Sequence, residues 1–98
     1  MDKTEARQIL RHQLAGYRER SYQQLLHLMK EEESFEIRAG SGATYRLEFQ
    51  AFWDDSKNKN IRVLGSIDDG GLRAIIPICE DFIISPDGSF IGEQGSLP

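Results

Sequence analysis

The stretch "YRLEFQAFW", residues 45–53, alternates apolar and polar side chains with a period of two. Successive side chains of a β-strand point to opposite faces, so this alternation is typical of a strand with one face in the core. The apolar phase consists of Tyr45, Leu47, Phe49, Ala51 and Trp53. We expect this phase to meet packed helices, while the opposite phase, which carries Phe52, faces outward.

The alternation continues on both sides of this strand. Residues 35–39 alternate in the same way and are joined to it by the glycine-containing turn 40–42. Residues 54–60, "DDSKNKN", contain no apolar side chain and predict a hairpin loop, after which residues 61–67 resume the alternation. Strands joined by such short connections predict an antiparallel sheet.

Residues 66–74, "SIDDGGLRA", lead out of the third predicted strand. Tight turns need positive φ, which Asp-Gly and Gly-Gly accept at low cost, so we interpret this stretch as a corner; the alternative is an aspartate pair placed for binding. The next apolar run, 72–78, is interrupted by Pro77, so its strand is expected to lie at an edge, or to be bulged or broken there. The last run, 82–91, contains a Pro-Asp-Gly turn at 86–88 and predicts a terminal hairpin.

Before residue 31 the apolar period lengthens to about 3.6, as in amphipathic helices. Asp2 or Thr4 can cap the first helix. Asp2 and Ser21 are followed three residues later by Glu5 and Gln24, respectively, which is capping-box spacing. The apolar stripes are Ala6, Ile9, Leu10, Leu14 and Tyr17, then Tyr22, Leu25, Leu26 and Met29. The sequence therefore predicts an α+β fold, with two N-terminal helices (about 4–30) packed on one face of a four- to five-stranded antiparallel β-meander (about 35–93).

Length and charge restrict the function. A chain of 98 residues is expected to form a single domain, 1–98. The net charge of −4 is uneven, since residues 1–30 carry +3 and residues 31–98 carry −7. An acidic surface argues against nucleic acid, whose phosphates require basic residues, and we expect no nucleic-acid partner. The asymmetry is compatible with self-association, including a homodimer, or with docking to a basic protein, although such a difference is more often typical of two solvated faces with no partner.

Cysteine usage and hydropathy indicate the compartment. The single cysteine, Cys79, excludes an internal disulfide and fits a reducing compartment. The N-terminal residues lack the apolar segment of a signal peptide, and no run approaches the roughly 18 apolar residues of a membrane span. We therefore expect a cytoplasmic protein with no membrane partner. Cys79 follows an apolar run and is expected to behave as a small hydrophobic residue.

Four aspartates stand beside predicted turns: Asp54, Asp55, Asp68 and Asp69. With Trp53, they are the residues that we expect to contact a ligand or partner. The side-chain oxygens of residues 54–60 also have the spacing of the ligands in a calcium-binding loop. However, Lys59 stands where that loop needs glycine, and Gly65 stands where it needs a bidentate glutamate. We therefore predict no metal site and no cofactor.

Two histidines and an arginine series are the other candidates. His12 and His27 could act as general bases near neutral pH, but a structural, partly buried role is the simpler interpretation. Three arginines share one side of the first predicted helix and indicate its solvated face, namely Arg7, Arg11 and Arg18. No catalytic residue is predicted.

Residues 52–93 resemble a group of small bacterial proteins known as a domain of unknown function. The pieces that carry this resemblance are Trp53-Asp54-Asp55, Gly65-Ser66-Ile67-Asp68-Asp69-Gly70-Gly71 and Ser85-Pro86-Asp87-Gly88-Ser89-Phe90, and it extends through the helical segment 21–26. The resemblance implies a compact bacterial domain and no particular activity, substrate or site.

The sequence is compatible with three functions. The first is a non-enzymatic interaction or accessory module, inhibitor- or immunity-like, whose contact is a sheet edge or the acidic strand ends. The alternative is an enzyme-like domain that binds a small ligand or divalent metal through the aspartate-rich loops. A third is a homodimer sealed by the outward-phase apolar residues Phe52, Leu64 and Ile75.

Overall fold

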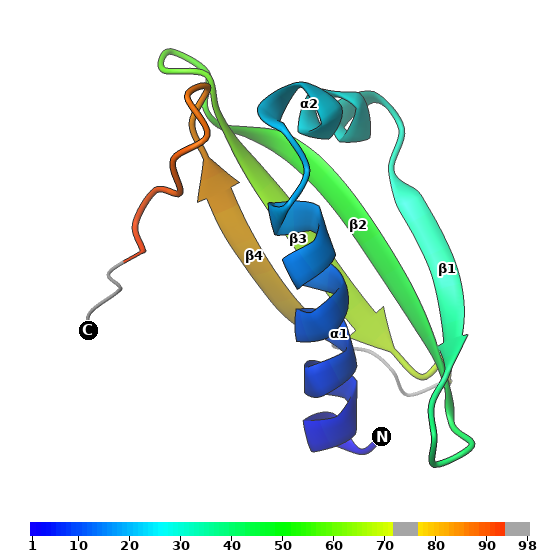
Figure 1. Cartoon of the computed structure of the whole chain (residues 1–98). Helices are drawn as coiled ribbons and strands as arrows, with labels where there is room; N and C mark the ends of the chain where they lie inside the picture. Colours follow the sequence, from blue (N-terminus) through cyan, green and yellow to red (C-terminus); the bar gives the residue numbers. More distant parts are fainter. Residues whose placement is uncertain (72–76, 94–98) are drawn as a thin grey trace.

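A computed structural model describes residues 1–71 and 77–93 of the chain. Its elements are α1 (Lys3–Arg18), α2 (Tyr22–Lys30), β1 (Glu33–Arg38), β2 (Thr44–Asp55), β3 (Asn60–Asp68) and β4 (Ile78–Ile84). The strands form one antiparallel sheet in the order β1-β2-β3-β4, and both helices lie over the same face of it (Figure 1). The α+β class, with two helices and a four-stranded antiparallel sheet, is therefore confirmed.

Both helices begin at the predicted caps. The Asp2 carboxylate accepts a hydrogen bond from the Glu5 backbone N–H at 3.0 Å. Ser21 and Gln24 form a complete capping box, in which each side chain bonds the backbone N–H of the other residue. Such side chains satisfy N–H groups that have no partner inside the helix, so local sequence alone fixes these two boundaries.

The core lies between the helices and the inner face of the sheet. β2 and β3 supply most of it, through Tyr45, Leu47, Phe49, Ala51, Ile61, Val63 and Ile67. α1 contributes the predicted stripe, whereas α2 buries Leu25 and Leu28 and leaves Tyr22, Leu26 and Met29 half-buried. The predicted stripe of α2 was therefore wrong in leaving out Leu28. Leu25 and Leu28, three positions apart, are the residues of this short helix that face the core.

The centre of the core is the ring of Phe49. It stacks on Tyr17 of α1 with ring centroids 4.3 Å apart, and on Phe35 of β1 at 5.9 Å. Opposite Phe49 in the β2–β3 register is Gly65, whose missing side chain makes the space for the ring. A Cβ built on Gly65 would lie 2.5 Å from Phe49 Cε1.

The fourth strand differs from the prediction. The expected strand at 72–78 lies largely outside the described residues, and β4 begins only at Ile78, directly after Pro77. Proline has no N–H to donate, so a strand that starts behind it loses no ladder bond. The predicted terminal hairpin is reduced to one isolated bridge, between Ile84 and Phe90, beyond the turn at 85–89.

Within the described residues, neither helix is both long enough and apolar enough to cross a membrane.

Candidate interaction surfaces

The predicted aspartate pairs lie at opposite ends of the sheet. Asp54 and Asp55 end β2, where Asp55 opposes Asn60 across the hairpin. Asp68 ends β3 at the other end of the sheet, opposite Arg46, and Asp69 follows it. The nine residues of β3 separate the two pairs by roughly 27 Å at about 3.3 Å per residue. One small ligand therefore cannot contact both pairs.

Most of these carboxylates shape the backbone around them. Asp55 accepts bonds from the N–H groups of Lys57 and Asn58, and its other oxygen accepts from the Asn58 side-chain amide at 2.6 Å. The Asn58 bonds, followed by the Lys57 bond, lower the pKa of Asp55 below its ordinary value. Asp68 accepts from Gly70 N–H at 2.8 Å, and Asp69 accepts from Gly71 N–H at 3.1 Å. No group of three or more potential metal ligands occurs in the described part of the chain.

Asp54 instead joins a charged row on the outer face of the sheet. Arg62 donates to Asp54 at 2.7 and 3.1 Å and also to Asp81 on β4. This row links β2, β3 and β4 through side chains that point away from the helices. Two carboxylates share one guanidinium, so the row carries a net charge of −1.

Apolar side chains flank this row on the outer face. Phe52 opposes Arg62, and Arg62 opposes Ile83, while Leu64 stands between Gln50 and Asp81. Phe52 is 41% exposed, and Leu64 and Ile83 are half-buried. The expected outward position of Phe52 and Leu64 is confirmed, whereas Ile75 lies outside the described residues. We call Phe52, Leu64 and Ile83 the outer patch.

Trp53 belongs to the inner phase of β2 but lies at its open end. Its side chain is 39% exposed, so the expectation that it enters the core was wrong. Lys59 lies over the indole, with Nζ 5.4 Å from the ring centroid. The ring forms one wall of a groove of about 490 Å³, whose other walls come from α2: Gln23, Leu26, His27, Met29 and Lys30. α2 thus borders this tryptophan but leaves it exposed.

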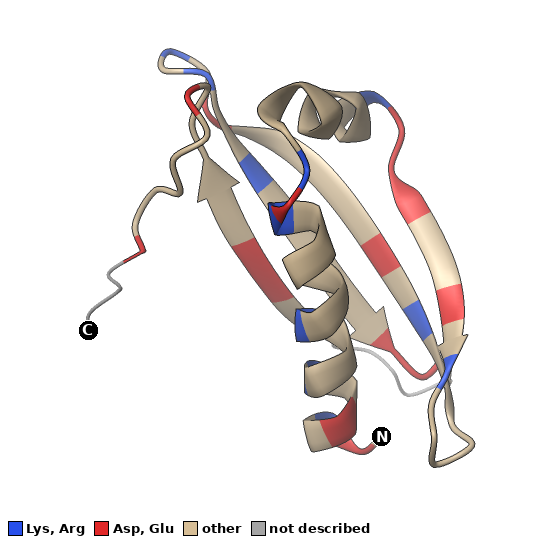
Figure 2. Ribbon diagram, in the orientation of Figure 1, with Lys and Arg blue, Asp and Glu red and all other residues tan. Residues whose placement is uncertain are grey.

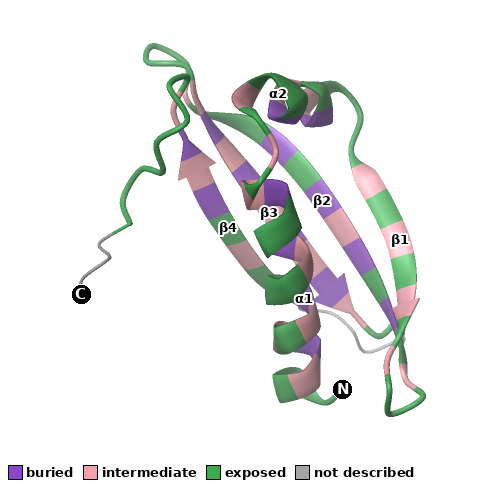
Figure 3. Ribbon diagram, in the orientation of Figure 1, coloured by how far each residue is buried: buried purple, intermediate pink, exposed green. Residues whose placement is uncertain are grey.

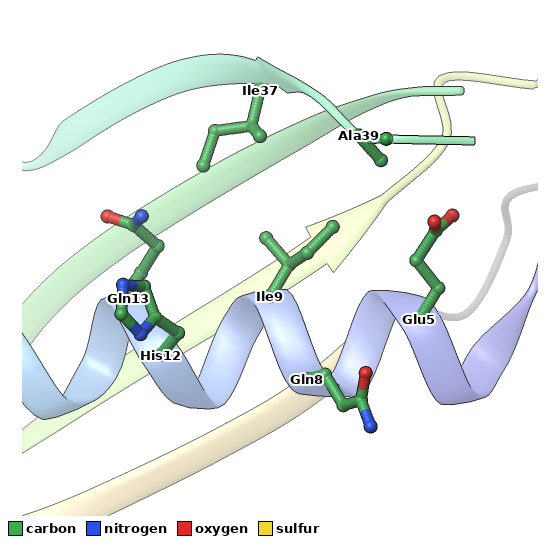
Figure 4. Close-up of a pocket in the computed structure, with 8 residues that line it drawn as sticks. Glu5, Gln8, Ile9, His12, Gln13, Ile37 and Ala39 are labelled. Carbon is green, nitrogen blue, oxygen red and sulfur yellow. The ribbon is translucent and has the colours of Figure 1, made fainter. Parts of the chain in front are cut away.

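A second groove, of about 310 Å³, runs between α1 and β1. Ile37 and Ala39 line it from the strand side, and Ile9 faces them from the helix (Figure 4). Polar groups of α1 complete the rim, namely Glu5, Gln8, His12 and Gln13. The groove exists because α1 packs over β3 and β4, and the inner face of β1 is therefore only partly covered.

Glu5 closes one end of this groove through two hydrogen bonds. Its Oε1 accepts from the hydroxyls of Tyr45 and Ser41, each at 2.8 Å. Burial, reinforced by the bond to Glu5 and its charge, raises the pKa of Tyr45 to about 12. Glu5 was predicted as the second half of a capping box, but its carboxylate ties α1 to the sheet instead.

This network predicts a loss of stability at high pH. The unfolded chain releases the tyrosine proton near pH 10, whereas folded Tyr45 retains it to about pH 12. Between these values the folded state binds more protons, so stability falls as pH rises. Tyr45→Phe should lower stability at neutral pH but flatten its decline above about pH 10, measured by urea unfolding. A decline of equal slope in both proteins would contradict this assignment, since Tyr17 is present in both.

A second network fixes the start of β1. Arg20 donates to both carboxylate oxygens of Glu33, at 3.1 and 3.2 Å, and Tyr17 donates to the same carboxylate. The Arg20 bonds, and then the Tyr17 bond, lower the pKa of Glu33. The Arg20 guanidinium also lies 4.1 Å from the centroid of the Tyr17 ring. The Glu33 carboxylate is thus hydrogen-bonded to residues of its own chain.

The arginine series on α1 also forms internal pairs. Arg7 and Arg11 lie 3.7 and 3.0 Å from a carboxylate oxygen of Glu80 on β4, and Arg18 forms a bidentate pair with Glu93. Figure 2 shows where basic and acidic residues fall along the ribbon. Glu80 is a charged residue on the core-facing side of β4, and the pairs with Arg7 and Arg11 balance its charge there. The interpretation of the series as a solvated face was therefore incomplete, because Arg7 and Arg11 also hold α1 against β4, and Arg18 holds it to Glu93 in the segment after β4.

The remaining candidates are exposed. His12 and His27 lie on the rims of the two grooves, so the expected partial burial was wrong for both. Cys79 is exposed on the outer phase of β4, because Ile78 takes the inner phase. Partial burial of its sulfur, and then the Asp81 carboxylate, raise the pKa of Cys79. That change disfavours the thiolate, which is the nucleophilic form.

The outer side of β1 is a free sheet edge, and its residues were not among the predicted contact residues. β1 is the first strand of the sheet, and within the described residues nothing pairs with its outer side. The opposite edge, on β4, is partly covered, since Ile91 N–H donates to the Ile83 carbonyl at 2.8 Å and Phe90 bridges Ile84. The predicted meander could have indicated this free edge, because the first strand of a simple meander lies at an edge of the sheet.

Comparisons with models of protein families, with curated proteins and with solved structures found no match to this chain.

Proposed function

We propose that this chain is a non-enzymatic interaction module, inhibitor- or immunity-like, that binds a basic partner protein on the outer face of its sheet. The observation that carries the proposal is the outer patch beside the charged row of Asp54, Arg62 and Asp81. Large apolar side chains next to carboxylates suit a protein surface with an apolar centre and basic rim.

The charge distribution supports a basic partner. The chain has a net charge of −4. Three arginines of α1 are paired with Glu80 and Glu93, which reduces the positive charge available to an outside molecule. Around the outer patch, two carboxylates face one guanidinium. A field of this sign would steer a positively charged protein toward the patch and repel an acidic one.

Only some of the predicted contact residues belong to this surface. Asp54 is part of the charged row, and Trp53 lies at the same end of β2 but on the inner phase. Asp55 is engaged in its own turn, and Asp68 and Asp69 lie at the far end of the sheet. The resemblance to a bacterial family of unknown function stays a prediction and does not bear on the choice of surface.

To test this, the wild-type chain is used to capture a basic protein from a native lysate, and the direct binding of the two proteins is then measured. With both proteins purified, Phe52→Ser and Leu64→Ser should each weaken binding by about tenfold or more, as expected for central interface residues. The matched control is Ile91→Ser, because Ile91 is 40% exposed and lies outside the patch. Circular dichroism must show that each variant is folded.

The affinity should also fall with added salt, because a basic partner is attracted by charge. Equal binding by wild type and both patch variants would overturn the assignment of the surface. A captured partner whose affinity does not change with salt would overturn the assignment of its charge.

A further inference from the structure

We propose that two copies of this chain pair through the free edges of β1, forming a continuous antiparallel sheet with a register centred on Phe35. This edge is a different surface from the outer patch, and pairing through it does not depend on the proposed partner. The two edges of the sheet differ. The β4 edge is partly covered by the segment that carries Phe90 and Ile91, whereas the β1 edge has no neighbour in residues 1–71 and 77–93.

β1 has few of the features that protect an edge strand, although it carries the charged residues Glu33, Glu36 and Arg38. Residues 33–38 contain no proline, no lysine and no bulge against β2. An edge strand of this kind presents unpaired backbone N–H and C=O groups along its outer side, and a second strand satisfies them most simply.

The side chains of β1 are also incompletely buried. β1 is the one strand of the described sheet without a buried residue (Figure 3). Phe35 and Ile37 point to the core face but remain half-buried beside the α1–β1 groove. A second β1 strand alongside would cover the exposed sides of both residues, which is apolar burial that the single chain does not achieve.

The charges of β1 select the register. Opposite residues of an antiparallel pair share a face, so a two-fold arrangement must be centred on a residue. Centring on Ser34 places Glu32 opposite Glu36 of the second copy, and centring on Glu36 places the two copies of Glu36 opposite each other. Centring on Ile37 pairs only residues 36–38 of the strand. The first two registers are disfavoured by like charges, and the third by its length.

A register centred on Phe35 avoids like charges opposite each other and pairs most of the strand. It pairs residues 33–37 of both copies and places the two Phe35 rings side by side on the core face. At each end of the pair, Glu32 lies opposite Arg38 of the second copy. Both side chains are exposed, and neither takes part in an ion pair within the described residues. Opposite charges at such positions stabilise paired strands.

Cysteine cross-linking tests the register. Ser34→Cys and Glu36→Cys are made separately, each together with Cys79→Ser, so that no native thiol competes. In the proposed register these two positions oppose each other, with Cα atoms about 5 Å apart, a distance that a disulfide spans. On mild oxidation, the mixture should give a disulfide-linked heterodimer by mass spectrometry, while either variant alone stays largely uncross-linked. Cross-linking within one variant, or none in the mixture, would overturn the register.

Charge reversal tests the interface itself. Sedimentation of the purified wild-type chain should show a monomer–dimer equilibrium. Arg38→Glu places like charges at both ends of the pair and should raise the dissociation constant about tenfold, and Glu32→Arg should do the same. Combining the two substitutions should restore dimerisation. The control is Lys57→Glu, which makes the same charge change in the distant β2–β3 hairpin.

A monomer at every concentration would overturn the proposal, as would an Arg38→Glu variant that dimerises like wild type. Because these measurements use the purified chain alone, their failure leaves the binding of a partner at the outer patch to its own test.

Discussion

Replacing Phe49 with alanine is expected to lower the free energy of unfolding by about 3–5 kcal/mol. The ring is fully buried, stacks on Tyr17 and Phe35, and fills the space above Gly65. Its removal takes away apolar burial and leaves a cavity whose walls come from α1, β1 and β3, and these elements cannot all close over it. The cost should appear in urea unfolding as a lower midpoint with an unchanged slope.

The matched control for Phe49→Ala is Phe52→Ala on the same strand. Phe52 lies three residues further along β2 but points outward and is 41% exposed. Its truncation should cost less than about 1 kcal/mol, as is usual for surface positions. If the two substitutions cost the same, the assignment of inner and outer faces to β2 would be wrong.

Gly65→Ala is expected to destabilise the fold by about 1–3 kcal/mol or more, although alanine is the smallest possible addition. The new Cβ would lie 2.5 and 2.9 Å from two carbons of the Phe49 ring and 3.1 Å from Leu10 Cδ1. Phe49 cannot give way easily, because Tyr17 and Phe35 hold its ring in place. The cause is steric crowding and not backbone conformation, since Gly65 is not among the glycines with positive φ.

Gly16→Ala supplies the opposite control. Gly16 is exposed in α1 and has no atom within 4 Å of a built Cβ. Alanine there should raise stability by about 0.5–1 kcal/mol, because it restricts the unfolded chain and favours the helix. Both variants are compared in the same thermal and urea unfolding experiments.

A stabilised Gly65→Ala would show that the ring of Phe49 does not lie over β3. Combining Gly65→Ala with Phe49→Leu should recover part of the loss, because a smaller side chain leaves room for the methyl group.

The location of the aspartate pairs could have been derived from the sequence. In a meander, consecutive turns alternate between the two ends of the sheet. The loop after β2 carries Asp54 and Asp55, and the connection after β3 carries Asp68 and Asp69, so their separation follows from the predicted strand order. The interpretation of the second pair as a corner agrees with its bonds to Gly70 and Gly71.

The local sequence determined the elements of this protein. The period of two in residues 45–53 sets the two faces of β2, and Asp2 and Ser21 set the helix starts, because these effects act within a few residues. Tertiary structure decided which surfaces stay open. α1 lies over β3 and β4, so Glu80 is paired, the groove beside β1 remains, and the outer patch is uncovered. A strand pattern states that one face is apolar, but only the packing of distant elements decides how much of that face is covered.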